Sequence, residues 1–215
     1  MPRALLSLLL LLAAACRTPA PAAAEPGAQQ APAQPQPPQP QPPQPTAEQA
    51  CAVTLCREPR TVTLVLDEER EMRQELPPFP YVYRDVVYVV PGDDFRLTGE
   101  VQGDRLVKLR VVKEGESPPL ALRIRFSQEV ESGTSMLMVL AVDSTLPRAL
   151  RYTVSMLPAE SAGGFQPTSS CPVLPGRSVY ESWPQPLRTL VLEDLRLVDL
   201  APGSAAKCEL SLIHI

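Results

Sequence analysis

Cysteines are the residues of this chain whose spacing says most about their chemistry, and they lie at Cys16, Cys51, Cys56, Cys171 and Cys208. The last four are an even number, which predicts two disulfides in an oxidising compartment and leaves three pairings open. A four-thiolate zinc site is the alternative, but such sites use closely spaced cysteine pairs, and two of these four cysteines stand alone. A redox-active pair would need a C-x-x-C motif, which the chain lacks. We therefore predict disulfides and no metal site.

Groups for enzyme chemistry are scarce. The single histidine is His214, and no serine lies in the Gly-x-Ser-x-Gly setting of a hydrolase nucleophile. Paired carboxylates could hydrolyse glycosides, and the candidates are Asp93-Asp94, Glu68-Glu69, Glu193-Asp194 and Glu181. Asp93-Asp94 follow Pro-Gly and indicate a turn, whereas Glu193-Asp194 interrupt a strand pattern and indicate a bulge. With no phosphate loop, dinucleotide fingerprint or EF-hand spacing either, we predict no catalytic residues, no cofactor and no enzyme.

Aromatic residues gather in two places. Four of the ten, Phe79, Tyr81, Tyr83 and Tyr88, lie within ten residues, and Tyr180 and Trp183 form a second group. Exposed Tyr and Trp suit sugar stacking or protein contacts, so Tyr81, Tyr83, Tyr180 and Trp183 are the candidate binding residues. The alternative, which we favour, is that Tyr81 and Tyr83 are ordinary strand residues and that Trp183 closes one end of the core.

The elements that position these residues begin with an export signal. Residues 1–15 read MPRALLSLLLLLAAA, with one positive charge before an apolar run. That run is shorter than the ~20 residues of a membrane span and is typical of a signal peptide. The segment Ala13-Ala14-Ala15-Cys16 resembles the lipobox of bacterial lipoproteins, although that box usually has Leu at the position of Ala13.

The resemblance implies that the mature chain begins at a lipidated Cys16. Because the next residue is Arg17 rather than Asp, it also implies anchoring in the outer membrane of a bacterial cell envelope, with the lipid as the contact with the membrane. Cleavage by an ordinary signal peptidase after Ala15 or Ala24 is the alternative, since both follow an A-x-A pattern. Either route exports the chain.

Residues 16–50 form a spacer. The stretch 17–50 contains 11 prolines and almost no charge, and residues 34–43 are two copies of QPQPP. This composition cannot bury a core and favours disordered, polyproline II-like chain. Fully extended, its 34 residues could reach on the order of 100 Å. We interpret it as a tether; the alternative, a PxxP ligand, lacks the flanking Arg or Lys.

From residue 51 to 209 the pattern has a period of two. In LALRIRF, Leu120, Leu122, Ile124 and Phe126 share one face, and Arg123 and Arg125 share the other. Such alternation predicts half-buried strands. Comparable strands are predicted at 61–66, 81–90, 95–101, 107–111, 150–156 and 187–200, and residues 136–142, apolar on both faces, indicate a central strand covered on both sides.

Turn residues separate these runs, and Gln102-Gly103-Asp104-Arg105 predicts a hairpin. The stretch 67–76, DEEREMRQEL, is the one predicted helix. About eight or nine short strands with so little helix predict an all-β fold, a single antiparallel β-sandwich of immunoglobulin-like or jelly-roll-like type.

The last six residues, 210–215, read LSLIHI. This hexapeptide resembles a translation of the transposon end used as a sequencing adaptor, so we interpret it as an artefact and exclude His214 from the candidate chemistry. The alternative is a native terminal strand, since the segment alternates.

The net charge of −4 argues against a nucleic-acid partner. We therefore expect an exported, non-catalytic envelope lipoprotein that presents a disulfide-braced β-sandwich on a proline-rich spacer and contacts another envelope component, a protein or a polysaccharide. A carbohydrate- or ligand-binding module using its Tyr and Trp residues is the alternative, and an envelope hydrolase using paired carboxylates is the third.

Overall fold

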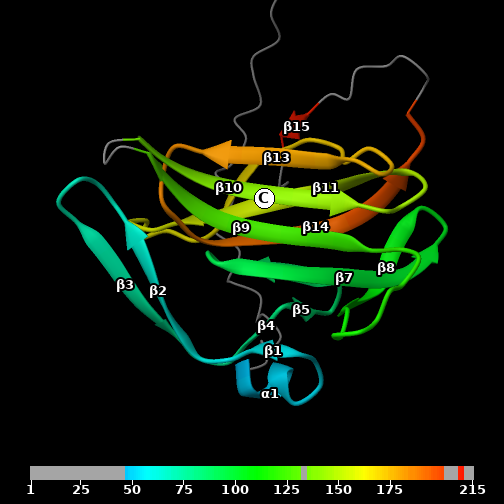
Figure 1. The fold of residues 1–215 in the computed structure, drawn as a ribbon, viewed down its shortest axis with the longest axis horizontal. Helices are drawn as coiled ribbons and strands as arrows, with labels where there is room; N and C mark the ends of the chain where they lie inside the picture. The colour runs from blue at the N-terminus through cyan, green and yellow to red at the C-terminus, as the bar shows by residue number, and fades with distance from the viewer. Residues whose placement is uncertain (1–46, 132–134, 201–207, 211–215) are drawn as a thin grey trace, which may run out of the picture. The chain divides into compact units, whose positions relative to one another are not determined.

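The computed structural model describes residues 47–131, 135–200 and 208–210, which form fifteen strands and one short helix (Figure 1). The elements are α1 (Ala47–Cys51), β1 (Cys56–Arg57), β2 (Arg60–Val65), β3 (Glu71–Leu76), β4 (Phe79–Pro80), β5 (Val82–Tyr83), β6 (Val86–Val89), β7 (Asp93–Gln102), β8 (Arg105–Val111), β9 (Leu122–Glu131), β10 (Ser135–Ser144), β11 (Ala149–Pro158), β12 (Gln166–Ser170), β13 (Ser178–Trp183), β14 (Leu187–Val198) and β15 (Glu209–Leu210).

Several predictions from the termini lie outside the described residues: the signal peptide 1–15, Cys16, most of the tether 16–50, and residues 211–215 of the adaptor-like segment. The two predicted domain boundaries fall inside elements. Helix α1 begins at Ala47, within the range assigned to the tether, and β15 includes Leu210, which pairs with Ser169 of β12.

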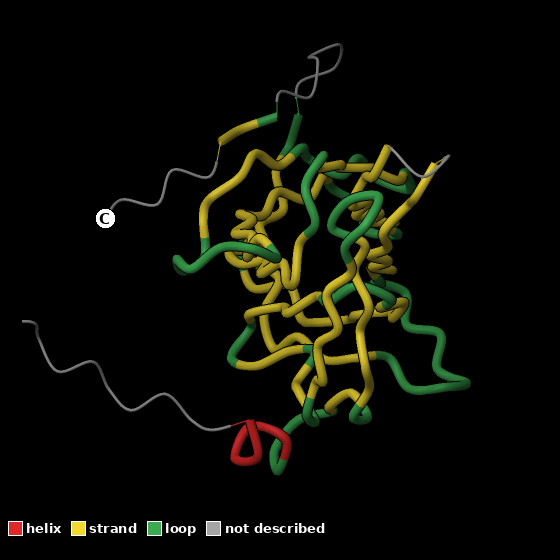
Figure 2. The backbone as a smooth tube through the Cα atoms, turned by 90° about the vertical axis from the view of Figure 1, so that its left-hand side faces the viewer, coloured by secondary structure: helices red, strands yellow, loops and turns green. Residues whose placement is uncertain are grey.

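The strands form an antiparallel β-sandwich, which confirms the predicted fold class. Most of them belong to one eleven-stranded sheet, in which nine strands follow the order β13-β10-β9-β7-β8-β14-β11-β12-β15, and β6 pairs with β14 and β5 with β6. The β8–β14 link is a single register pair, Arg105 with Arg196, so the path divides there into two layers. Figure 1 shows β13, β10, β9 and β7 side by side in one layer, and Figure 2 shows α1 at one end of the body.

The core lies between the layers and is built from the predicted alternation. Leu122, Ile124 and Phe126 of β9 are fully buried, while Arg123 between them is exposed. Met138, Leu140 and Val142 of β10 and Leu150, Tyr152 and Val154 of β11 are buried in the same way. Period-two alternation therefore identified the core faces of β9 and β11, because successive side chains point to opposite faces of a sheet.

Strand β10 is central, between β13 and β9, as predicted, but only one of its faces is buried throughout. On the other face Leu137 is 40% exposed and Val139 is half-buried. The predicted cover on both sides is therefore wrong. On this outer face Ala141 is buried, unlike Leu137 and Val139, and Tyr180 of the neighbouring strand β13 lies opposite it.

The predicted helix at 67–76 is also wrong. Asp67 begins a turn in which its carboxylate accepts hydrogen bonds from the backbone N–H groups of Glu69 and Arg70, at 3.0 and 2.9 Å. Residues 71–76 then form β3, which pairs with β2 and directs Met72 and Leu76 toward the core. Tertiary pairing with β2 thus overrides the helix propensity of Glu, Met, Arg and Gln.

The hairpin at 102–105 is confirmed, with Gln102 paired to Arg105 and Gly103 at φ +65°. Its strands contain an irregularity that alternation did not predict. Lys108 has φ +51°, so Leu106 and Leu109 are the buried residues of β8 instead of a strict alternating set. Opposite this point, a Cβ on Gly99 would lie only 2.8 Å from the carbonyl oxygen of Val107, which explains the glycine there.

Candidate functional site

Two disulfides resolve the pairing that the cysteine spacing left open: Cys51 bonds to Cys56, and Cys171 to Cys208. The first joins the last residue of α1 to the first residue of β1. The second joins the segment after β12 to the residue before β15. In the described part of the chain no group of three or more His, Cys, Asp or Glu side chains could hold a metal ion.

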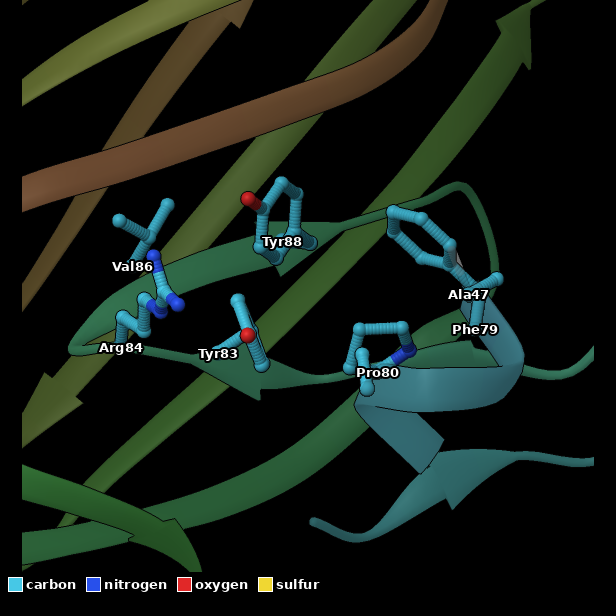
Figure 3. A pocket seen from close by; sticks show the side chains of 8 residues that line it. Ala47, Phe79, Pro80, Tyr83, Arg84, Val86 and Tyr88 are labelled. Carbon is cyan, nitrogen blue, oxygen red and sulfur yellow. The ribbon is translucent and has the colours of Figure 1, made fainter. Parts of the chain in front are cut away.

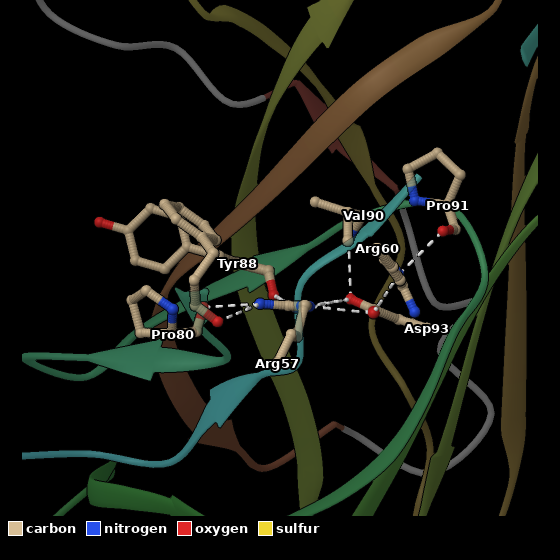
Figure 4. Close-up of polar contacts among 8 residues, drawn as sticks. Arg57, Arg60, Pro80, Tyr88, Val90, Pro91 and Asp93 are labelled. Atoms are coloured by element: carbon tan, nitrogen blue, oxygen red, sulfur yellow. Dashed lines mark hydrogen bonds and ion pairs between the residues drawn. The ribbon is translucent and has the colours of Figure 1, made fainter. Parts of the chain in front are cut away.

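Just after the first disulfide, Arg57 is buried to 3% exposure beside Asp93 (Figure 4). Its Nε lies 3.0 Å from both Asp93 carboxylate oxygens, and its Nη2 donates to one of them. Its other donors reach the carbonyl oxygens of Pro80, at 2.6 Å, and Tyr88. The guanidinium carbon also lies 4.1 Å from the centre of the Tyr81 ring. This one side chain therefore joins β1, β4, β6 and β7.

Asp93 plays the turn-forming role that the sequence predicted. Its carboxylate accepts the backbone N–H of Val90 at 2.9 Å, and its own N–H donates to the Val90 carbonyl at 3.1 Å. Arg60 adds a second ion pair at 2.7 Å. The neighbouring Asp94 points outward and pairs with Arg123 at 2.6 Å, which holds the pKa of Asp94 below its usual range. These two carboxylates thus have separate structural partners.

Glu181 on β13 is the other buried carboxyl group, with 8% exposure. Its Oε1 accepts hydrogen bonds from the Tyr152 hydroxyl at 3.1 Å and from the Cys171 N–H at 3.0 Å, whereas Oε2 is buried with no partner. Burial raises the pKa of Glu181, and the two hydrogen bonds only partly oppose that. Because Oε2 receives no hydrogen bond, nothing on that oxygen offsets the cost of burying the charged form.

The remaining candidate carboxylates lie at irregular points of the chain. Glu68 and Glu69 belong to the bend before β3. Glu193 and Asp194 form the predicted bulge: the register between β11 and β14 shifts there, and Asp194 has φ +53°. Both side chains are exposed, and Asp194 binds Arg196 at 2.7 Å.

Of the four candidate binding aromatics, two have rings that pack against other residues of the fold. Trp183 is only 7% exposed, and its Nε1 donates to the Thr168 hydroxyl of the opposite layer at 2.9 Å. Its assignment as a binding residue is therefore wrong, because a buried ring cannot stack on a ligand. Tyr81 packs against Phe95 at 4.7 Å and against Arg57.

The other two candidates are accessible, on different parts of the fold. Tyr180 is 66% exposed and stands on the outer face of β13, the edge strand of its layer. The segment 178–183, for which we predicted no strand, is thus β13. Tyr83, on β5, lines a hollow. The sequence placed Tyr81 and Tyr83 in one strand, but Tyr81 lies in the bend between β4 and β5, so the two rings have different surroundings.

This hollow, of about 360 Å³, is the candidate binding site (Figure 3). It is lined by Ala47 and Ala50 of α1, Phe79 and Pro80 of β4, Tyr83 of β5, Arg84, and Val86 and Tyr88 of β6. The Phe79 and Tyr88 rings meet edge to face with centroids 5.2 Å apart, which fixes the orientation of Tyr88. Arg57 holds the backbone of this wall through the carbonyl groups of Pro80 and Tyr88.

Arg84 reaches the hollow from an unusual turn. Tyr83 pairs with Val86, so Arg84 and Asp85 form a two-residue hairpin loop, and both have positive φ, 51° and 61°. Such a loop prefers Asn-Gly, and each residue with a Cβ in this conformation costs about 1 kcal/mol or more. Asp85 holds the loop, because its carboxylate accepts the Leu109 N–H at 2.8 Å.

The Arg84 guanidinium is exposed and lies 5.2 Å from the Tyr83 ring centre. We find no hydrogen bond or ion pair for it within the described residues. Tyr88 has its pKa raised first by burial and then by the negative charge of Glu193. The hollow thus combines a cation with half-buried rings, and a carboxylate lies near Tyr88. The aromatic residues within ten positions of each other were the local signal for Phe79, Tyr83 and Tyr88, but nothing local suggested Arg84 as their partner.

No protein-family model, curated protein or solved structure matches this chain. Over the residues that the structure describes, no helix has the length and apolarity needed to span a bilayer.

Proposed function

We propose that this protein is an exported, non-catalytic binding domain of a bacterial cell envelope. In this proposal a lipid on Cys16 anchors the chain, the proline-rich residues before α1 act as a spacer, and the β-sandwich contacts another envelope component. The two disulfides support export, because such bonds persist in oxidising compartments.

The observation that carries the binding role is the hollow beside Arg84. It is concave, it combines aromatic rings with a cation, and its turn has Arg and Asp, in place of the preferred Asn-Gly, at two positive-φ positions. A non-catalytic role is supported by the buried charged groups, since Asp93 is bonded to Arg57 and Arg60, and Glu181 bonds to Tyr152 and to backbone.

Two measurements test the proposal. Labelled palmitate should be incorporated into the wild type and not into Cys16→Ser, and an unlabelled wild type would contradict lipid anchoring. The exported, unlipidated protein should sediment with the insoluble envelope fraction of the producing cells, and Tyr83→Ala should reduce that retention. Equal retention of Tyr83→Ala and wild type, or no retention of either, would contradict binding through the hollow.

A further inference from the structure

We propose that the hollow binds an acidic saccharide, with the sugar carboxylate at Arg84 and the sugar rings against Tyr83 and Tyr88. This inference rests on the proposed binding function and names the chemical class of its ligand. It follows from three features of the hollow: the turn that presents Arg84, the rings along the wall, and the charge near Tyr88.

The two residues of this turn have different roles: Asp85 holds the backbone, and the side chain of Arg84 is exposed to solvent. Asp85 secures the loop through its bond to the Leu109 N–H, so the backbone conformation does not depend on Arg84. Arg84 has φ 51°, and its side chain makes no hydrogen bond or ion pair with the described residues; its guanidinium carbon lies 5.2 Å from the centre of the Tyr83 ring. A guanidinium held in this way presents its planar donor fork to solvent, and a carboxylate is the group that this fork binds in a bidentate manner.

The wall supplies surfaces for the body of the ligand. Tyr83, Tyr88 and Phe79 are half-buried, and the edge-to-face contact of Phe79 with Tyr88 orders the second ring. Each tyrosine combines an apolar ring with a hydroxyl that donates and accepts hydrogen bonds. A sugar presents apolar C–H groups on its ring and hydroxyls at its edges, so it matches both parts of this lining. The volume of about 360 Å³ is in the range of small-ligand sites.

A carboxylate also lies near this wall. In the antiparallel register of β6 and β14, Val191 lies opposite Tyr88 and Leu192 opposite Val87, so Glu193 follows beside Val86. Glu193 is exposed on the β14 bulge, and its negative charge opposes the binding of an anion in the hollow. The proposal thus predicts opposite effects for two substitutions: removing the Arg84 charge weakens binding, and removing the Glu193 charge strengthens it.

Isothermal titration of the disulfide-intact exported protein with a galacturonate oligomer tests this. The same oligomer with its carboxylates methyl-esterified is the matched neutral ligand, and polyglutamate is the acidic peptide. We expect the galacturonate oligomer to bind, with affinity lower by about tenfold or more for the esterified oligomer and for Arg84→Gln. Glu193→Gln should bind it a few-fold more tightly, and Arg73→Gln, an exposed cation on β3, should leave the affinity unchanged.

Equal affinity for the two oligomers, an unchanged Arg84→Gln, or no binding would overturn the proposal. Tighter binding of polyglutamate than of galacturonate, dependent on Arg84, would overturn the saccharide class and indicate an acidic polypeptide. Because Arg84 makes no bond to the described fold, Arg84→Gln should unfold at the wild-type temperature, which separates lost affinity from lost structure. If the envelope fraction retains the protein through Tyr83 while the oligomer does not bind, only this inference fails, and the proposed binding function stands.

Discussion

Arg57→Ala offers the sharpest test of how the N-terminal segment is attached to the sandwich. The substitution removes the ion pair with Asp93 and the hydrogen bonds to the Pro80 and Tyr88 carbonyl oxygens, all within a site where the Arg57 side chain is 2% exposed. Breaking a buried ion pair by removing one partner costs about 3–5 kcal/mol, because the other charge stays buried without compensation.

Two contacts limit that loss here. Asp93 keeps Arg60 at 2.7 Å and the Val90 N–H at 2.9 Å, so its charge is not left alone. The two carbonyl groups, in contrast, lose their donor, and a buried unsatisfied polar group costs about 1–3 kcal/mol. We therefore expect Arg57→Ala to lower the free energy of unfolding by about 3–5 kcal/mol, a large part of the stability of an ordinary domain.

Urea unfolding of the unreduced protein at pH 7, followed by tryptophan fluorescence, measures this loss. The chain has a single tryptophan, the buried Trp183, so the signal reports the core. Arg73→Ala, on the exposed strand β3, is the matched control and should change the stability by less than about 0.5 kcal/mol. A loss below about 1 kcal/mol for Arg57→Ala would refute the argument that this guanidinium joins four strands. If that variant does not fold, Arg57→Lys, which keeps the charge but loses the fork, should show a smaller loss.

Four further substitutions test other parts of the structure. The raised pKa of Glu181 means that the folded state holds this proton to higher pH than the unfolded state does. The free energy of unfolding of the wild type should therefore fall as the pH rises from about 4.5. Urea titrations across pH should show no such fall for Glu181→Gln, and a constant difference between the two proteins would contradict the prediction. Cys171→Ser opens a disulfide between cysteines 37 positions apart and should lower the free energy of unfolding by about 4 kcal/mol. Cys51→Ser opens one between cysteines 5 positions apart and should lower it by about 2 kcal/mol. Thiol titration of the unreduced wild-type domain should find no free cysteine. Gly99→Ala should lower the melting temperature by an amount equivalent to about 1–3 kcal/mol, because its Cβ would lie 2.8 Å from the Val107 carbonyl oxygen; an unchanged melting temperature would show that β7 and β8 can separate there.

Local patterns in the sequence were sufficient for much of the fold. Alternation located the core faces of β9 and β11, and turn residues located the 102–105 hairpin. The acidic pair at 193–194 indicated the bulge in β14. These features depend on neighbouring residues along one strand, and a single chain segment carries that information.

Local patterns failed where a partner strand decided the outcome. Residues 71–76 contain good helix formers, yet pairing with β2 makes them a strand; the alternation of Met72 and Leu76 with charged residues was the available signal. Strands β12 and β13 were not predicted, because both are edge-proximal segments next to Pro-rich turns. Trp183 could have been a binding residue or a core residue, and only its contact with Thr168 decides between them.

By itself, the sequence determined an all-β sandwich with paired cysteines, since strand alternation and cysteine number are properties of the linear chain. The tertiary structure alone decided the cysteine pairing, the bond between Arg57 and Asp93 across 36 positions, and the hollow that places Arg84 beside rings from three strands. The physical reason is that side-chain spacing along a strand is fixed by the backbone, whereas contacts across the sandwich depend on how strands distant in sequence are registered and layered.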